Sequence, residues 1–245
     1  MASTPAPILI FGATGGIGAA LARRLASAGH PLFLSARRPD ALAALGAEVQ
    51  APWHAADVTD WVQIDAAMDA AVAQYGAIGG VAHCVGSLIL KPAHLTRFDE
   101  FQQTIAQNLT SAFGVVRAAA RVMTAGGSVV LCSSAAARIG LANHEAIAAA
   151  KGGIQGLVLS AAATYAPRGL RFNAVAPGLV ETPLTARITG SPTAREASQG
   201  MHALGRIGSP ADVAPAMQWL LSDDAAWVTG QIVGVDGGLG SVRAK

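Results

Sequence analysis

Residues 8–18 read ILIFGATGGIG, a short apolar run followed by a cluster of glycines. The four apolar residues 8–11 predict a strand that is covered on both faces, as in a parallel sheet. Residues 17–27 predict a helix directly after the glycines. Because glycine has no side chain, the backbone between them can turn sharply and allow a close approach. This segment predicts a strand–turn–helix unit, on which the interpretation of the whole chain rests.

A glycine turn between a first strand and a helix is typical of a binding site for the pyrophosphate of a dinucleotide. The amide groups and the dipole at the helix N-terminus favour negative charge there. A flexible turn without a ligand is the alternative, but the strand and helix on either side favour the binding site. We predict cofactor contacts at Gly12, Thr14, Gly15, Gly16, Ile17 and Gly18.

Strands and helices alternate along the rest of the sequence. We expect strands at 31–35, 48–54, 78–85, 128–132, 170–175 and 232–235, and helices at 41–45, 60–75, 98–123, 145–165 and 210–221. This alternation predicts an α/β fold with a parallel sheet and right-handed crossovers. Residues 178–209 are predicted to be irregular, as in loops that cover binding sites. No linker divides the chain, so residues 1–245 are interpreted as a single domain.

The composition argues against several classes of function. The 245 residues are 52% hydrophobic and 13% charged, with a formal net charge of +2 and no run of Lys or Arg. We therefore expect no nucleic-acid partner, and the two cysteines lack the spacing of a metal site. Residues 1–7 do not resemble a signal peptide, and the apolar helical stretch 154–163 is too short to span a bilayer. We expect a soluble, cytoplasmic protein without a membrane partner.

The end of the second strand indicates which dinucleotide is bound. An acidic residue there would bind the ribose 2′-hydroxyl of NAD. The sequence instead has Arg37 and Arg38, which suit the 2′-phosphate of NADP. Two solvated surface arginines are the alternative. The prediction is NADP(H) in preference to NAD(H).

A set of further motifs is spread over nearly the whole chain. In chain order they are Gly-x3-Gly-x-Gly at 12–18, Asn108, Ser134, Lys151, NAVAPG at 173–178, Thr182, Gly230 and DGG at 236–238. Together they resemble the motifs of the short-chain dehydrogenase/reductase family. The resemblance implies a Rossmann-type, doubly wound parallel sheet of seven strands in the order 3-2-1-4-5-6-7. It also implies cofactor contacts at Asp57, Val58, Gly86, Lys151, Pro177, Gly178 and Thr182.

The family uses a serine, a lysine, and a tyrosine four residues before that lysine. By resemblance, Ser134 orients the substrate, Lys151 binds the nicotinamide ribose, and Asn108 holds a water beside the lysine. The tyrosine gives or takes the proton as the hydride moves. In this chain the residue four before Lys151 is Ile147, which cannot donate a proton. His83 also departs from the family pattern, and we interpret it as a core histidine.

Several sources of the proton remain open. His144 lies seven residues before Lys151, a spacing that returns to nearly the same helix face. An enoyl-reductase branch of the family has its tyrosine at this spacing, and histidine exchanges protons near neutral pH. Alternatively, His144 is a helix-start residue that faces a neighbour or solvent. The proton then comes from a water, from Ser134 or from an already protonated imine. Glu145 points away from Lys151 and favours the helix N-terminus by its charge.

These observations predict an NADP(H)-dependent oxidoreductase that transfers hydride to a carbonyl or imine carbon of a small, largely apolar substrate. We expect a substrate pocket formed by Ser134, His144, Ile147 and Met201. The alternative is a catalytically inactive dinucleotide-binding protein, acting as a sensor or a structural partner. Retention of the serine and the lysine argues for the enzyme.

Two further expectations concern the surface. The loop at 184–204 is expected to cover the substrate, and its residues Ile188, Met201, His202 and Leu204 suggest a largely apolar pocket. The helix that begins at 145 also contains Gly152, Gly153 and Gly156 among alanines, which allows close helix–helix approach. By resemblance to the family we expect a homotetramer built on such helices, with a dimer as the alternative.

Overall fold

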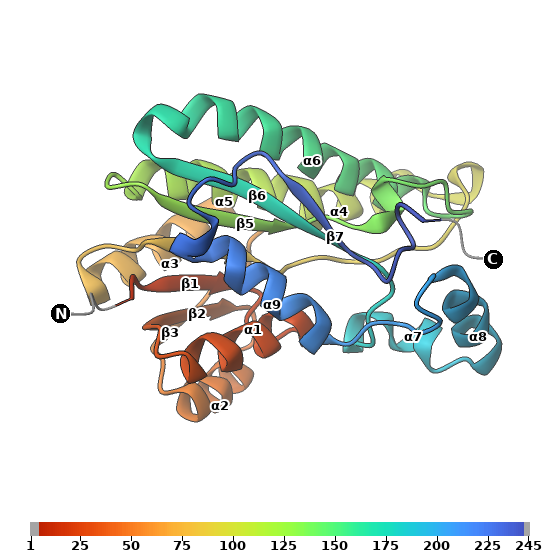
Figure 1. Cartoon of the computed structure of the whole chain (residues 1–245), viewed down its shortest axis with the longest axis horizontal. Helices are drawn as coiled ribbons and strands as arrows, with labels where there is room; N and C mark the ends of the chain where they lie inside the picture. The colour runs from red at the N-terminus through yellow and green to blue at the C-terminus, as the bar shows by residue number, and fades with distance from the viewer. Residues whose placement is uncertain (1–4, 243–245) are drawn as a thin grey trace.

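The computed structural model describes residues 5–242 and shows one seven-stranded sheet between two layers of helices (Figure 1). The strands are β1 (Ile8–Phe11), β2 (Leu32–Ala36), β3 (Trp53–Ala55), β4 (Gly80–His83), β5 (Gly127–Cys132), β6 (Leu170–Pro177) and β7 (Ile232–Val235). Their order is β3-β2-β1-β4-β5-β6-β7, and all neighbouring pairs are parallel. The predicted α/β fold and strand order are confirmed.

Helices cover both faces of the sheet. The α-helices are α1 (Gly16–Ser27), α2 (Pro39–Val49), α3 (Trp61–Tyr75), α4 (Phe98–Ile105), α5 (Ser111–Val122), α6 (Glu145–Tyr165), α7 (Ala186–Thr189), α8 (Pro192–Met201) and α9 (Pro210–Leu221). In β1, Leu9 and Phe11 pack in the core with α3, α5 and α6, whereas Ile8 and Ile10 pack in the core with α1, α2 and α9. Burial of both faces explains why this strand is a continuous apolar run.

The second crossover differs from the prediction. Helix α2 is longer than the predicted 41–45, and β3 is shorter than the predicted 48–54. Helix α2 begins with Pro39 in its first turn, and Leu42 and Leu45 hold it on the core at a helical spacing. It ends at Gln50, whose φ of 52° reverses the chain direction. The residues that were expected to begin a strand therefore complete a helix.

The helix predicted over 98–123 is interrupted. A π-helical turn, Ala106–Thr110, separates α4 from α5. Such turns are rare and occur frequently at functional sites. Asn108 lies within this turn and is fully buried. The π turn is thus the local structure that places this side chain inside the molecule.

The stretch 178–209, predicted to be irregular, contains α7 and α8. Ser191 caps α8, because its Oγ accepts a hydrogen bond from the backbone N–H of Ala194 at 3.4 Å. Pro192 occupies the first helical turn, where it is well tolerated. The prediction was wrong because α8 is polar overall and its apolar residues, although spaced as in a helix, are mostly small. In Figure 1 the two helices project together at one end of the molecule.

Helix α6 is relevant to the membrane prediction. With the turn that follows it, the segment Glu145–Arg168 is long and apolar enough to cross a bilayer, so the argument from the short stretch 154–163 was wrong. In the structure Ile154 and Val158 are fully buried in the core that this helix shares with the sheet. Packing on the sheet therefore accounts for the apolar character of the helix.

Candidate functional site

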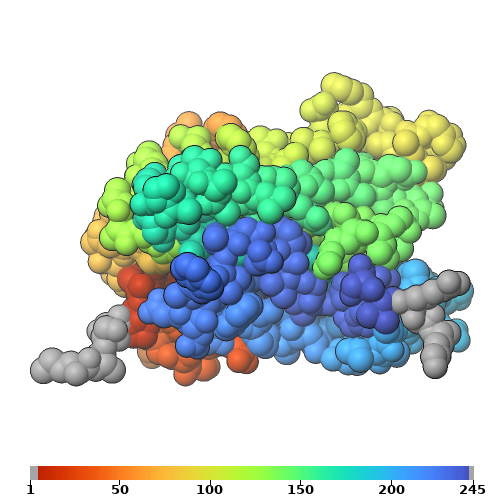
Figure 2. Space-filling view, turned by 45° about the horizontal axis from the view of Figure 1, so that its top comes forward, coloured from red at the N-terminus to blue at the C-terminus, as the bar shows by residue number. Residues whose placement is uncertain are grey.

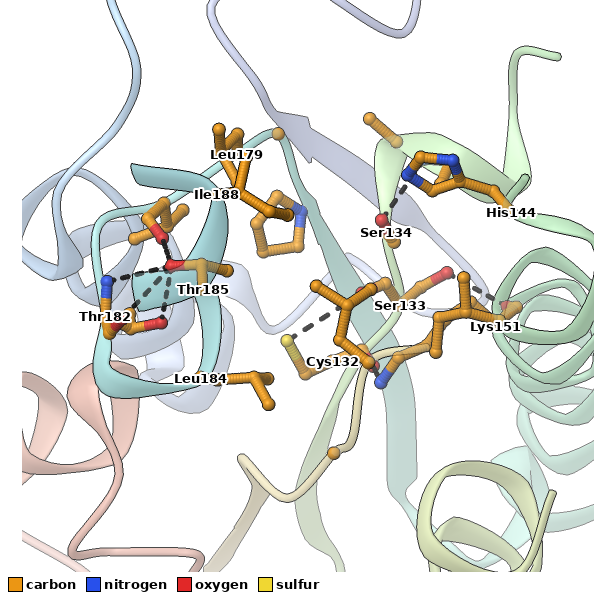
Figure 3. A pocket seen from close by; sticks show the side chains of 18 of the residues that line it. Cys132, Ser133, Ser134, His144, Lys151, Leu179, Thr182, Leu184, Thr185 and Ile188 are labelled. Atoms are coloured by element: carbon orange, nitrogen blue, oxygen red, sulfur yellow. Dashed lines mark hydrogen bonds between the residues drawn. The ribbon is translucent and has the colours of Figure 1, made fainter. Parts of the chain in front are cut away.

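A pocket of about 250 Å³ opens beyond the C-terminal ends of β4, β5 and β6 (Figure 3). Ligands of open α/β sheets bind at this edge. The lining comes from the loops after these strands, from the start of α6 and from the segment 182–202. It is mainly apolar, and its polar groups include Ser134, His144 and Lys151.

The glycine turn after β1 adjoins this pocket and leaves no room for side chains. Gly12 has φ of 75°, a conformation that favours glycine. A Cβ at Gly16 would lie 2.6 Å from Cγ2 of Thr182, which lines the pocket, and a Cβ at Gly18 would collide with the carbonyl oxygen of Gly12. The turn thus presents bare backbone and the N-terminus of α1 beside the pocket. This geometry fits the pyrophosphate of a dinucleotide.

The two arginines after β2 are exposed to solvent. Nearby Arg23 forms an ion pair with Glu48, with 2.6 Å between Nε and Oε1. Within residues 5–242, neither Arg37 nor Arg38 has a carboxylate partner. Both guanidinium groups are therefore available to an anionic ligand at this edge of the sheet.

Asp57 and Val58 follow β3. The Asp57 carboxylate accepts hydrogen bonds from the backbone N–H of Thr59 at 2.9 Å and from its hydroxyl at 2.8 Å. The backbone hydrogen bond from Thr59 is the main cause that holds the pKa of Asp57 below its usual value, and Arg37 adds to it. Asp57 is thus an ionised turn residue, and its expected contact with the cofactor stays a prediction.

Two consecutive serines after β5 have different roles. Ser133 is buried, and its Oγ donates to the carbonyl oxygen of Lys151 at 3.0 Å. It also accepts a hydrogen bond from Gln155 at 3.2 Å. Ser134 lines the pocket, where its Oγ accepts a hydrogen bond from the backbone N–H of Ala136 at 3.2 Å. The hydroxyl of Ser134 therefore keeps its proton available for a pocket group, whereas Ser133 fixes α6 to the sheet.

Lys151 extends from α6 into the pocket. Its Nζ donates to the carbonyl oxygen of Cys132 at 2.8 Å. The side chain is buried, and this desolvation lowers the pKa of Lys151 below its usual value. The free thiols of Cys84 and Cys132 also line the pocket. Their pKa values are raised, chiefly by burial, so both are protonated at neutral pH.

Asn108 and Gly86 lie beside the lysine. Nδ2 of Asn108 donates to the carbonyl oxygen of Thr104 at 2.9 Å and to Oγ of Ser87 at 3.0 Å. A Cβ at Gly86 would lie 2.9 Å from Oδ1 of Asn108 and 3.4 Å from Nζ of Lys151. The glycine therefore lets these two polar groups approach the same point. The role of Asn108 in holding a water stays a prediction.

His144 is the N-cap of α6, and its backbone angles lie outside the helix. The sequence argument placed it by helical periodicity, and this reason is wrong, although the residue does line the pocket. Its Nδ1 lies 2.8 Å from the carbonyl oxygen of Ala142. Because a carbonyl can only accept, Nδ1 carries the proton in this hydrogen bond. Figure 3 shows the opposite edge of the ring directed at Ser134.

Ile147 is buried in the wall of the pocket. Both tyrosines of the chain lie within the described residues, and both are used elsewhere. The hydroxyl of Tyr75 donates to the carbonyl oxygen of Leu32 at 2.9 Å, and the ring of Tyr165 packs on Phe172. Across residues 5–242, therefore, the pocket has no phenol as a proton donor.

His83, at the end of β4, is fully buried outside the pocket lining. Its Nε2 lies 3.0 Å from Oγ of Ser111, whose proton points to the carbonyl oxygen of Gln107 at 2.8 Å. Burial, together with the charge of Lys151, lowers the pKa of His83 to about 3. It is a neutral core side chain, as the sequence analysis expects.

Sequence reasoning missed part of the apolar wall. Leu88, Leu90 and Leu141 line the pocket, and each follows a strand in a loop without periodic pattern. Their position after β4 and β5, at the ligand edge, is the signal that could have identified them. Met201 lines the pocket, whereas Leu204, expected beside it, is 72% exposed and lies outside the lining.

Comparisons with known proteins identify the family. A family model described as enoyl-(acyl carrier protein) reductase matches residues 12–240. The chain is 38% identical over 241 residues to a cis-4-hydroxycyclohexanecarboxylate dehydrogenase of Sinomonas cyclohexanicum, with 96% of each chain covered. A short-chain type dehydrogenase/reductase of Mycobacterium ulcerans has a TM-score of 0.92 and 32% identity, covering 100% of this chain and 93% of its own.

An actinorhodin polyketide ketoreductase solved with NADPH also matches, with a TM-score of 0.92 and 27% identity, covering 99% of this chain and 100% of its own. The chain belongs to the short-chain dehydrogenase/reductase family. It is therefore an oxidoreductase of the kind that uses a nicotinamide dinucleotide.

Proposed function

We propose that this protein is an NADP(H)-dependent oxidoreductase that interconverts a ketone and a secondary alcohol on a small, uncharged, alicyclic substrate. His144 carries the proton, and Ser134 orients the substrate oxygen. The observation that carries this proposal is the orientation of the His144 ring between the carbonyl of Ala142 and the hydroxyl of Ser134.

The hydrogen bond to Ala142 fixes the tautomer of the neutral His144 ring. Nδ1 carries the proton and donates the hydrogen bond to the carbonyl of Ala142. In the neutral ring, Nε2 therefore has a free lone pair, which faces Ser134. In alcohol oxidation Nε2 takes the hydroxyl proton, directly or through Ser134. In ketone reduction the imidazolium returns a proton to the developing alkoxide. This supplies the acid–base function that Ile147 cannot.

The charges of the pocket favour a neutral substrate. Among residues 5–242, no Asp or Glu lines it, and Lys151 is its buried cationic side chain. A protonated imine would meet this cation without a carboxylate to compensate for its own desolvation. Among the described residues that line the pocket, a substrate carboxylate would find only Lys151 as a cationic partner, and this group is assigned to the nicotinamide ribose. A neutral ring bearing a ketone fits the apolar wall. The relative from Sinomonas is named for a hydroxycyclohexane that also bears a carboxylate, so its name supports the ring and the alcohol but not the absence of charge.

The cofactor would be held by the glycine turn and the residues after the strands. Because Gly16 and Gly18 have no side chains, the turn packs closely on Thr182 and on the start of α1, and its bare backbone would face the pyrophosphate. Arg37 and Arg38 form no ion pair among residues 5–242, and their positive charge favours the 2′-phosphate of NADP. Lys151 would bind the nicotinamide ribose. When bound, the nicotinamide gives or accepts the hydride.

Residues 184–204, which we call the lid, would cover the substrate. Leu184, Ile188 and Met201 of this segment all line the pocket (Figure 3). Closing these apolar side chains over the ring would exclude water from the hydride-transfer step. Of the polar residues of α8, Glu196 is exposed on the outside of the lid, whereas Ser198 is buried and lines the pocket.

We also propose that the chain assembles as a homotetramer, with α6 in one interface. Gly153 packs on Leu109 of its own chain, whereas a Cβ at Gly152 or Gly156 would meet nothing within 4 Å. The neighbouring side chain of Leu159 is 58% exposed. In Figure 2, α6 and the segment leading to β7 lie next to one another on the same face. Light scattering tests this: Gly156→Trp should dissociate the assembly, and a monomeric wild type would contradict it.

The test of the function is NADPH oxidation by the purified protein in three parallel reactions. The substrates are cyclohexanone, a cyclohexanone that bears a carboxylate, and a cyclic imine. The proposal predicts turnover of the uncharged ketone with a kcat/KM at least about tenfold above either of the others. Turnover of the imine alone would replace the proposal with imine reduction, for which Ile147 was the sequence argument. Tight NADPH binding without any turnover would favour an inactive binding protein.

A further inference from the structure

His202 lies where the lid returns to the body of the protein. It directly follows α8 as its C-cap and is only 3% exposed. The same ring lines the substrate pocket and a second hollow, next to Asp236 and Gly237, on the other side of the lid. The imidazole therefore forms a wall between the pocket and the C-terminal segment.

Both ring nitrogens of His202 are used. Nδ1 lies 2.6 Å from the carbonyl oxygen of Ser198, one of the carbonyls left free at the end of α8. Nε2 accepts a hydrogen bond from the backbone N–H of Leu179 at 3.2 Å. Since one partner only accepts and the other only donates, the ring must be neutral with its proton on Nδ1. It connects the last turn of the lid helix to the segment directly after β6.

Two glycines leave room for the imidazole ring of His202. A Cβ at Gly178 would lie 2.6 Å from Nε2 of His202, and a Cβ at Gly237 would lie 3.5 Å from its Cδ2. Within residues 5–242, the other side-chain hydrogen bond or ion pair between α8 and the body is that of Arg195 with Glu181, in which both partners are about one-third exposed or more. Exposed ion pairs contribute little. His202 is thus the buried connection of α8 to the body.

We infer that His202 is a positioning residue that couples the closed lid to the Gly178–Leu179 backbone, where the nicotinamide would bind. Both of its ring nitrogens bind backbone groups, so it is not itself the proton carrier. Loss of its two hydrogen bonds leaves the amide of Leu179 and the carbonyl of Ser198 without partners, which favours an open lid. The inference rests on the proposed function for its kinetic consequence, but its structural part is independent of activity.

The test uses trypsin, because Arg187 on α7 and Arg195 on α8 place cleavage sites on the lid. We compare the wild type with His202→Phe, which keeps a ring in the slot without hydrogen bonds, and with His202→Gln, whose amide can both donate and accept. His94→Ala, at an exposed histidine away from the pocket, is the matched control. Circular dichroism establishes that each variant is folded before its lid is probed.

The inference predicts about tenfold or faster lid cleavage in His202→Phe. His202→Gln and His94→Ala should stay within about threefold of the wild type. In turnover of the ketone, His202→Phe should raise KM more than it lowers kcat, and His202→Gln should restore both. Wild-type cleavage rates in His202→Phe, or failure of His202→Gln to differ from it, would overturn the inference. If the wild type turns over no substrate, the proposed function fails, and the cleavage rates still decide the role of His202.

Discussion

The glycine turn after β1 and the start of α6 border the same pocket but contribute to it in different ways, the first through its backbone and the second through a side chain. The turn acts through its backbone: Gly12, Gly16 and Gly18 matter for the side chains they lack. At the start of α6, by contrast, the proposed function depends on one side chain: the resemblance to the family predicts a tyrosine at the position of Ile147, and the ring of His144 faces Ser134. A backbone site tolerates little variation, since any Cβ fills it. A proton can be carried by any suitable group that reaches the substrate oxygen.

The largest expected effect comes from a change in the glycine turn, which acts through its backbone. In Gly18→Val the new Cβ collides with the carbonyl oxygen of Gly12, so the turn must deform and lose its alignment with α1. We expect the Kd for NADPH to rise about 100-fold or more, as for the loss of several charge-assisted hydrogen bonds. Tryptophan-to-NADPH energy transfer measures this.

The control for that variant is Gly200→Ala, where a Cβ meets nothing within 4 Å. It should bind NADPH as the wild type does. Wild-type affinity in Gly18→Val would show that the turn does not hold the cofactor.

A smaller effect concerns the two arginines after β2, whose side chains are proposed to bind the cofactor. In a variant with both Arg37→Ala and Arg38→Ala, the preference for NADPH over NADH should fall by about 10-fold to 100-fold, because charge-assisted hydrogen bonds to the 2′-phosphate are lost. Affinity for NADH should hardly change. The ratio of the two kcat/KM values measures this preference, with Arg23→Ala as the control, since Arg23 already pairs with Glu48. An unchanged ratio would show that the two arginines are solvated surface residues without a role in cofactor preference.

The smallest effect concerns the stability of the cofactor-free protein. Burial lowers the pKa of Lys151, so the folded chain releases this proton at a lower pH than the unfolded chain, whose lysine has the ordinary value of 10.5. Between these two values the unfolded state binds more protons, and stability therefore rises with pH. We expect Lys151→Met to be more stable than the wild type near neutral pH, with an advantage that shrinks as the pH rises towards 10.5. Urea unfolding at a series of pH values measures it, and an advantage that grows with pH would contradict the assignment.

The sequence predicts the sheet better than it predicts the lid. Ile8–Phe11, Pro210–Leu221 and Ile232–Val235 begin and end where they were predicted, because apolar runs and a proline in the first turn mark them. The helices α7 and α8 were missed, since α7 is a single turn and the apolar side of α8 consists mostly of small residues. The π turn around Asn108 was also missed, because no local residue pattern distinguishes it from an α-helix.

The candidate site was partly predictable for a similar reason. Ser134 lies just after the end of β5, and Lys151 lies in the second turn of α6. Because regular elements place these two residues, both could be predicted, and both line the pocket. The orientation of His144 depends instead on a non-helical backbone and on the carbonyl of Ala142, which periodicity does not encode. The hydrogen bond of His202 to Leu179 joins residues 23 apart along the chain and was equally hidden.

The most direct test of the account is steady-state ketone reduction by His144→Ala, with NADPH affinity measured on the same preparation. The account predicts that kcat falls about 100-fold or more, as for loss of a general acid, while the Kd for NADPH stays the same. Adding Ile147→Tyr to this variant should recover part of the lost rate, because it restores a phenol four residues before Lys151. A His144→Ala enzyme that reduces the ketone at the wild-type rate would contradict the claim that this histidine carries the proton.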